Sequence, residues 1–291
     1  MALRYHLYDV FTSTPYTGNP LAIVEDADAL SDAQMQHIAV EFNLSETIFL
    51  RAPRSADHIA SARIFTPKYE LPFAGHPTIG AAIFLAETHG LSNLVIEEVA
   101  GDVPVTIPNG ANDVARFKAP IIPFAADTMA PTAQDMSRAL GVSDADTKGF
   151  RTGVFEGGPR FIYGELASRE ALSRVKPCQP AFDQMAEKAG TDACYVFVQT
   201  GAHSLQARMV HSYSEDPATG SASAILAAFL LQTHRLNEGA NRWTLTQGVE
   251  MGRPSQITLD INVKGGTLSS VYIEGAAVRI ASGMLTTIPA L

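Results

Sequence analysis

Two segments of the chain are apolar on nearly every side over the length of an ordinary helix, and they limit the folds available. They are "TIGAAIFLAETHG" (78–90) and the apolar stretch over 221–234. A helix that is apolar all round has to be surrounded by protein. A bilayer span needs ~20 apolar residues, and the longest strongly apolar stretch here is Ala224–Leu231. Each segment therefore predicts a central helix enclosed by other elements.

Both helices follow a corner of similar composition. "ELPFAGHPT" begins at Glu70 and "EDPATGSA" begins at Glu215, and an arginine lies seven residues before each glutamate, Arg63 and Arg208. A repeated arrangement at this spacing indicates an internal duplication. We therefore predict an α+β fold of two pseudo-symmetric units, each a barrel of strands wrapped around its central apolar helix.

The rest of the sequence fits this plan. Strand patterns occupy most of the intervals between the corners, and Ser31 with Gln34 forms a capping-box pattern at the start of an amphipathic helix (31–42). We predict an N-terminal unit over 1–118, a Pro- and Ala-rich linker over 119–131 and a C-terminal unit over 132–291. An alternative assignment places the last strands of the C-terminal unit in the N-terminal unit.

Composition narrows the classes of partner. The 291-residue chain is 46% hydrophobic and 18% charged, as in a soluble globular protein, and its net charge of −9 gives nucleic acid or an anionic membrane no electrostatic support. The N-terminal "MALRYHLYDVF" does not resemble a signal peptide, and Cys178 and Cys194 lack metal-ligand spacing. We expect a cytoplasmic protein with no metal, and the lack of a nucleotide-binding motif predicts no cofactor.

The two corners have the chemistry of anion sites. The first turn of a helix leaves N–H groups unpaired and carries partial positive charge. Gly75 and Gly220 let a ligand approach the backbone, and Pro77 near the helix start costs no hydrogen bond. If residues 75–78, which include Thr78, and residues 219–222 face one cleft, they would bind a small anionic substrate or stabilise an enolate. For either corner alone, a plain turn is the alternative interpretation.

Several longer motifs carry a resemblance to a known family. They are "GNPLAIV" (18–24), "NLSETIF" (43–49), "FTPKYELPFAGHPTIG" (65–80), "EDPATGSASA" (215–224) and "QGVEMGRPS" (247–255). In this order, over nearly the whole chain, they resemble the PhzF-like isomerases of phenazine biosynthesis. The resemblance implies the diaminopimelate epimerase-like fold, a site between the two units and a homodimer.

The resemblance also carries candidate site residues. The wider superfamily uses one cysteine per half, just before the helix glycine, but Ala74 and Ala218 stand at those positions here, so two-cysteine racemisation is not available. PhzF-like members use a glutamate as acid/base instead, which maps to Glu46, and an apolar setting can raise the pKa of such a carboxyl. The other positions implied by the family are the supporting groups His76, Asp216 and Ser221, and the cleft-lining residues Asn19, Gly75 and Gly220.

Together these features predict a cofactor-independent isomerase that moves a proton on a small carboxylate-bearing, unsaturated substrate. Glu46 would remove the proton from one carbon and return it elsewhere on the conjugated system. Two alternatives stay open: a lyase or hydratase on the same scaffold, and a binding protein that keeps the fold without the chemistry.

Overall fold

The computed structural model describes residues 2–108 and 114–290. Internal contacts divide the chain into two compact units, one of Met1–Lys118 with Glu274–Leu291 and one of Ala119–Ile273. This division places residues 119–131, the expected linker, with the second unit, and returns residues 274–291 to the first. The long strand β17 (Thr267–Leu285) runs from one unit into the other.

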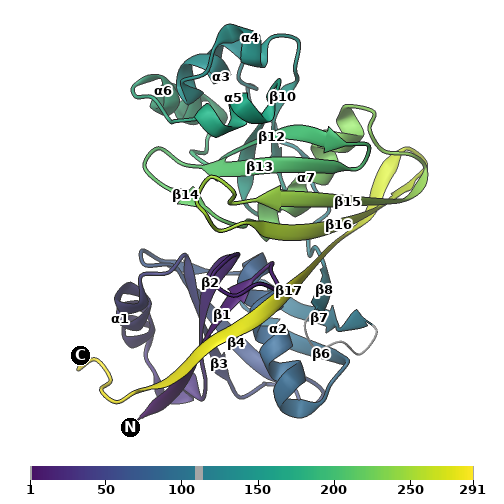
Figure 1. Cartoon of the computed structure of the whole chain (residues 1–291). Coiled ribbons are helices and arrows are strands. Elements are labelled where there is room, and N and C mark those ends of the chain that lie inside the picture. Colours follow the sequence, from purple (N-terminus) through teal and green to yellow (C-terminus); the bar gives the residue numbers. More distant parts are fainter. Residues whose placement is uncertain (1, 109–113, 291) are drawn as a thin grey trace. The chain divides into compact units, whose positions relative to one another are not determined.

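In its described residues, the first unit consists of strands with three helical segments (Figure 1). Besides part of β17, its elements are β1 (Leu3–Val10), β2 (Asn19–Val24), the 3-10 turn η1 (Ala27–Ala29), α1 (Asp32–Phe42), β3 (Glu46–Arg51), β4 (Ala60–Phe65), β5 (Glu70–Leu71), α2 (Gly75–His89), β6 (Asn93–Glu98), β7 (Gly101–Thr106) and β8 (Val114–Lys118).

Eight strands of this unit close a barrel around α2. Each neighbour in the series β1, β2, β3, β4, β6, β7, β8 pairs with the next, and β17 pairs with both β8 and β1. Pairs β2–β3 and β4–β6 are parallel, while β1–β2, β3–β4, β6–β7 and β7–β8 are antiparallel. Every residue of α2 from Gly75 to Ala86 is buried, and the helix contacts β1, β2, β3, β6 and β8. The apolar sequence of α2 is thus explained by its enclosure.

The second unit contains the remaining elements. They are β9 (Phe124–Ala125), α3 (Ala133–Leu140), α4 (Asp144–Thr147), β10 (Thr152–Glu156), β11 (Arg160–Glu165), α5 (Arg169–Arg174), α6 (Ala181–Ala189), β12 (Cys194–Gly201), β13 (Ser204–Val210), β14 (Glu215–Asp216), α7 (Gly220–Gln232), β15 (Gly239–Gln247) and β16 (Ser255–Lys264).

This unit repeats the connectivity of the first. Pairs β10–β11, β12–β13 and β15–β16 are antiparallel, and pairs β11–β12 and β13–β15 are parallel, in the same alternation as β1 to β7. Helix α7 is buried from Ala222 to Leu230 and contacts β9, β10, β11 and β16. The predicted α+β fold with an enclosed apolar helix in each duplicated unit is confirmed.

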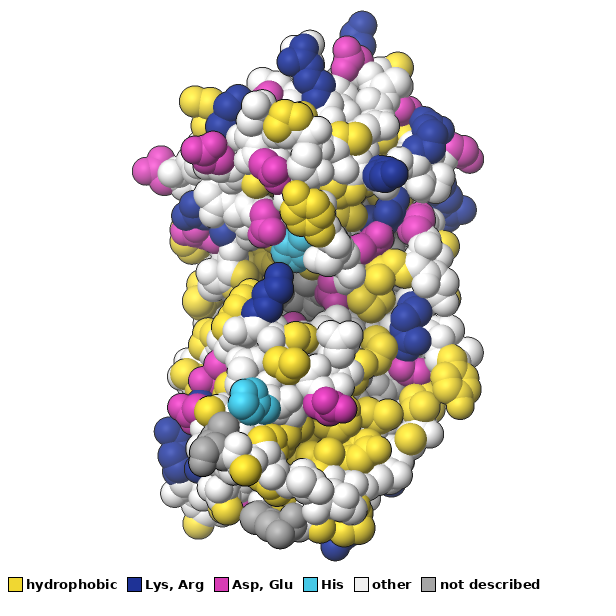
Figure 2. Space-filling view, turned by 90° about the vertical axis from the view of Figure 1, so that its left-hand side faces the viewer, with side chains coloured by type: hydrophobic (Ala, Val, Ile, Leu, Met, Phe, Trp, Pro, Cys, Tyr) yellow, Lys and Arg dark blue, Asp and Glu magenta, His cyan; other side chains and the backbone are white. Residues whose placement is uncertain are grey.

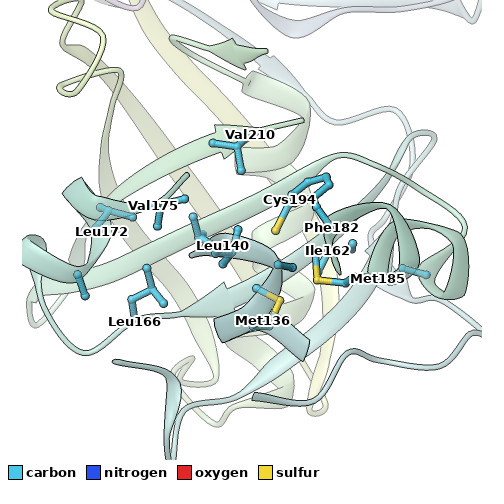
Figure 3. Packing of buried hydrophobic residues seen from close by; sticks show 14 of the residues in the cluster. Met136, Leu140, Ile162, Leu166, Leu172, Val175, Phe182, Met185, Cys194 and Val210 are labelled. Carbon is cyan, nitrogen blue, oxygen red and sulfur yellow. The ribbon is translucent and has the colours of Figure 1, made fainter. Parts of the chain in front are cut away.

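Four short helices on the second unit form a separate layer. Side chains from α3, α5 and α6 pack with residues of β10 to β13 in one buried cluster (Figure 3). Cys194 lies within this cluster, and burial raises the pKa of its thiol well above the usual value. This cysteine is therefore a core side chain of the second unit.

Strand β17 is longer than the sequence predicts. The residue pattern of the sequence predicts a strand near 268–274, whereas the observed strand runs from Thr267 to Leu285. Its second part pairs with β1 in the register Val10↔Ala277 to Leu3↔Leu285. Its side chains become mostly exposed after Ile280, so the alternation that marks a strand in sequence is lost while the backbone pairing continues.

The surface carries charges of both signs. On the face in Figure 2, Lys and Arg side chains of the described residues lie among Asp and Glu side chains and form no continuous patch. None of the helices within 2–108 and 114–290 combines the length and the apolar character that crossing a membrane requires.

An arginine–glutamate pair fastens each corner to its barrel. Arg63 on β4 binds both carboxylate oxygens of Glu70 on β5, with Nη2 at 2.7 Å from Oε2. Arg208 on β13 binds Glu215 on β14 in the same way, with distances of 2.9 and 2.8 Å. Arg208 also donates to the backbone carbonyls of Leu172 and Val175, each at 2.9 Å. The seven-residue spacing in the sequence is therefore the spacing of a two-strand clamp.

The two clamps differ in burial, which predicts different costs of removal. The Arg208 side chain is 9% exposed and that of Arg63 is 18% exposed. Arg208→Ala removes the cation paired with Glu215 and a donor to two backbone carbonyls in a buried place, and should lower the free energy of unfolding by about 3–5 kcal/mol. Arg63→Ala should lower the free energy of unfolding by only about 1–2 kcal/mol, because the partners of Arg63 are more exposed to solvent. Urea unfolding of both variants measures the difference, and equal costs would contradict this account.

Candidate active site

The first corner ends in an uncapped helix start. Helix α2 begins at Gly75, and its N-cap residue Ala74 offers no side-chain hydrogen bond. Gly75, His76, Pro77 and Thr78 are all buried. The first-turn N–H groups of Gly75 and His76 therefore lie in a low-dielectric setting, where the partial positive charge of the helix end is strongest.

Three predicted residues meet beside this helix start. Asn19 is the first residue of β2 and Glu46 the first residue of β3, and these strands run parallel with Leu21 opposite Glu46. Parallel strands bring their first residues to the same edge of the barrel. His76 Nδ1 lies 3.3 Å from Asn19 Nδ2 and 3.4 Å from Glu46 Oε2. The structure thus brings Asn19, Glu46 and His76 into one polar cluster.

Burial decides the state of the imidazole. His76 is 4% exposed, and the loss of hydration lowers its pKa from 6.5 to about 3. The ring is therefore neutral at pH 7. Nδ1 faces both the Asn19 amide nitrogen and Glu46 Oε2, whereas Nε2 is a buried atom with no protein partner among the described residues. Nε2 is therefore the ring atom left to form a hydrogen bond with a ligand.

A buried glutamate lies behind the same turn and was not anticipated from the sequence. Thr78 Oγ1 is 2.6 Å from Oε1 of Glu98, the last residue of β6. Glu98 is 2% exposed, and burial raises the pKa of its carboxyl to about 8. The signal was the pair Glu97-Glu98 at a strand end, but two adjacent glutamates suggest a solvated end, whereas both are 2% exposed here.

The second corner is organised by a buried glutamine, Gln247, the last residue of β15. Its Oε1 accepts from the backbone N–H of Thr219 at 3.1 Å, and its Nε2 donates to the Asp216 carbonyl at 2.7 Å. Thr219 Oγ1 donates to Asp216 Oδ2 at 2.5 Å. Gly220 begins α7 and Ser221 is half-buried in its first turn. Gln247 opens the "QGVEMGRPS" motif, so the motif was noticed but the role of its first residue was missed.

The predicted residues thus fall into two local sets. The set on the first unit is Asn19, Glu46, Gly75, His76, Pro77 and Thr78, and the set on the second unit is Asp216, Gly220 and Ser221. The roles assigned to these residues, and the hypothesis that both sets act on one substrate, stay predictions.

Within residues 2–108 and 114–290, no group of three or more His, Cys, Asp or Glu side chains is arranged to hold a metal ion. The positions just before the two helix glycines, 74 and 218, carry alanine.

Comparison with known proteins places the chain in a family. The family model described as "Phenazine biosynthesis-like protein" matches residues 8–283. The chain is 39% identical to an uncharacterised isomerase of Mesorhizobium japonicum, over 97% of this chain and 98% of that protein. It is 34% identical to trans-2,3-dihydro-3-hydroxyanthranilate isomerase of Pseudomonas fluorescens, over 97% and 99%. A Bacillus anthracis protein of the PhzF family superposes with a TM-score of 0.86 at 24% identity, covering 99% of this chain and all of that one.

The fold, the relatives and the family match make the protein an enzyme of the isomerase class. It belongs to the PhzF-like family of phenazine biosynthesis-like proteins. The family resemblance recognised in the sequence motifs is confirmed.

The buried neutral imidazole predicts a pH dependence of stability. Because the pKa of His76 is lower in the folded state than the usual 6.5, the unfolded chain binds a proton that the folded chain rejects. The free energy of unfolding is therefore highest above pH 6.5. It decreases as the pH falls, by about 3 kcal/mol at pH 4. Denaturant unfolding from pH 4 to pH 8 should show this slope in the wild type and in the exposed-histidine control His37→Asn. The slope should be reduced in His76→Asn, and an unchanged slope would refute the assignment.

Proposed function

We propose that this isomerase moves a proton between two carbons of a small, unsaturated, carboxylate-bearing substrate, with Glu46 as the acid/base. The observation that carries the proposal is the contact of Glu46 Oε2 with the buried ring of His76, at 3.4 Å, beside an uncapped helix start. A carboxylate next to a low-dielectric helix end combines a proton acceptor with a place for the negative charge that proton removal creates.

The proposed reaction conserves all atoms. Glu46 takes a proton from a carbon of the substrate, the electron pair of that C–H bond shifts through the conjugated system, and Glu46 returns the proton to a second carbon. The first-turn N–H groups of α2 stabilise the substrate carboxylate and the developing charge on it. His76, held by Asn19, forms a hydrogen bond with the substrate through Nε2. No cofactor takes part in this scheme.

The substrate class is proposed from the Pseudomonas relative. That protein is named for trans-2,3-dihydro-3-hydroxyanthranilate, a cyclic unsaturated amino acid with a hydroxyl group. At 34% identity we propose related unsaturated amino or hydroxy acids for this chain, acting in the cytoplasm in a homodimer.

The role of Glu46 is tested by solvent exchange. The protein is incubated in D₂O with trans-2,3-dihydro-3-hydroxyanthranilate and with a panel of unsaturated amino and hydroxy acids. The product of a true substrate should carry deuterium on carbon at an otherwise unchanged mass. Glu46→Gln should lower the rate by about 10²–10⁴-fold, because the general acid/base is removed. The control is Glu41→Gln, which changes an exposed glutamate of α1. A product that lacks water or ammonia, or full activity of Glu46→Gln, would contradict the proposal.

We also propose that Asp216 and Ser221 contribute to the same reaction. With the substrate identified above, Ser221→Ala should raise KM and Asp216→Asn should lower kcat, each by at least about tenfold, since each removes a polar interaction with a charged group. Unchanged kinetics in both variants would restrict the site to the first corner.

A further inference from the structure

The corner of the second unit shows what holds a helix start of this kind. In the parallel pair β13–β15, Gln247 lies opposite Ala207, the residue just before the clamp arginine Arg208. From there its amide accepts from the N–H of Thr219, the N-cap residue of α7, and donates to the carbonyl of Asp216. One neutral side chain, acting as acceptor and donor at once, fixes the start of the central helix.

Glu98 occupies the equivalent place in the first unit. The parallel pair β4–β6 has Ser61 opposite Glu97, so Glu98 follows beside Ala62, the residue just before the clamp arginine Arg63. The backbone N–H of Ala74, the N-cap residue of α2, lies close enough to the Glu98 carboxyl to lower its pKa. Glu98 is thus the counterpart of Gln247 in strand, register and N-cap contact, with a carboxyl in place of an amide.

The contacts of Thr78 indicate that the carboxyl of Glu98 carries a proton. Its single hydroxyl oxygen lies 2.7 Å from the carbonyl oxygen of Ala74 and 2.6 Å from Oε1 of Glu98. A carbonyl oxygen can only accept, and a threonine hydroxyl has one proton to donate. If that proton goes to Ala74, the second short contact needs a proton on Glu98, which then donates to Thr78. A carboxylic acid satisfies both contacts, whereas a carboxylate leaves two acceptors facing one donor.

Among the described residues, no cationic side chain acts on the Glu98 carboxyl. The titratable side chains on the neighbouring elements are His76, Glu87 and His89 on α2, Arg63 on β4, Glu70 on β5 and Asp102 on β7, with Glu97 next to Glu98 on β6. Glu87 is bound to Arg279, Glu97 is bound to Arg54, and His89 is exposed at the far end of α2. His76 is neutral, Arg63 is bound to Glu70, and Asp102 is largely exposed. The pKa of Glu98 is raised to about 8 by burial, opposed only by the Thr78 hydroxyl and the Ala74 N–H. At neutral pH the uncharged form predominates.

We propose that Glu98, as a neutral carboxylic acid, does for the first corner what Gln247 does for the second, and thereby acts as the positioning residue for His76. It holds Ala74 and Thr78, which lie on either side of His76 in the first turn of α2. Ionisation of Glu98 releases this turn. The first corner therefore keeps this arrangement only below the pH at which Glu98 ionises. The relevance to catalysis rests on the proposed function, whereas the protonation and the positioning do not, and the experiment uses no substrate.

The first measurement compares thermal stability of wild type and Glu98→Gln from pH 5 to pH 9.5. The folded state keeps a proton on Glu98 that the unfolded chain loses near pH 4.5, so stability falls with rising pH until the folded carboxyl ionises near 8. The wild-type Tm should fall relative to Glu98→Gln by about 5–10 °C between pH 5 and 8, and the difference should then level off. A constant difference over this range would overturn the proposal.

Two further variants test whether the effect belongs to Glu98: one is a control, and the other places a carboxyl at the equivalent position of the second unit. Glu97→Gln changes the adjacent glutamate, whose pKa is held at about 2 by Arg54, by backbone N–H groups and by His58, so this carboxyl stays ionised and Glu97→Gln should keep the fall in Tm that Glu98→Gln removes. Gln247→Glu puts a carboxyl into the equivalent place of the second unit and should introduce the same downward slope. A slope in Glu97→Gln equal to that of Glu98→Gln would refute the assignment to Glu98.

The second measurement observes the groups directly and does not depend on the variant folding. In the wild type labelled with ¹³C-glutamate and ¹⁵N-histidine, one side-chain carboxyl should titrate near pH 8, and should persist in Glu46→Gln. The His76 ring resonances should shift with the same midpoint while keeping the pattern of neutral imidazole, because the ring moves without titrating. A purely structural Glu98 would leave His76 unchanged, and a Glu98 carboxyl that titrates near pH 4.5 would overturn the proposal.

Discussion

The structure depends on the enclosure of an apolar helix by strands. Helix α2 is buried over its first twelve residues, so it has no polar face to present to water and folds only if a barrel closes around it. That closure uses strands from both ends of the chain, because β17 pairs with β1 and β8. It also buries the start of the helix, whose unpaired N–H groups would otherwise be hydrated. The site chemistry follows from this burial, since the barrel edge supplies the side chains around the helix start.

Burial has opposite effects on the titratable groups of that region. His76 is kept neutral by losing its proton, and Glu98 is kept neutral by retaining one. Both effects have the same cause, which is the cost of an unpaired charge in a low-dielectric interior. The ionised side chains of the corners are those that have partners: Arg63 with Glu70, and Arg208 with Glu215. The first corner therefore offers a ligand the partial positive charge of the helix end, with the Glu46 carboxyl as the acidic group beside it.

The duplication makes the differences between the units informative. Strand order, clamp and helix start agree, yet the residue that contacts the N-cap is an amide in one unit and a carboxyl in the other. Such a replacement at an equivalent position keeps the hydrogen-bond geometry and changes only the dependence on protons. The family match and the isomerase relatives fix the class of the enzyme.

The sequence alone determined the enclosed helices, the duplicated corners and the family, because apolar periodicity and a fixed Arg-to-Glu spacing are local patterns. It also placed Glu46 and His76 in motifs. Only the tertiary structure decided that Asn19 contacts His76, that Glu98 faces the corner, and that β17 continues to Leu285 along β1. These contacts join residues far apart in the chain, and the pairing of strands that creates them leaves no periodic signal in any one segment. The pKa of a buried group likewise follows from its surroundings, which form only when the barrel closes.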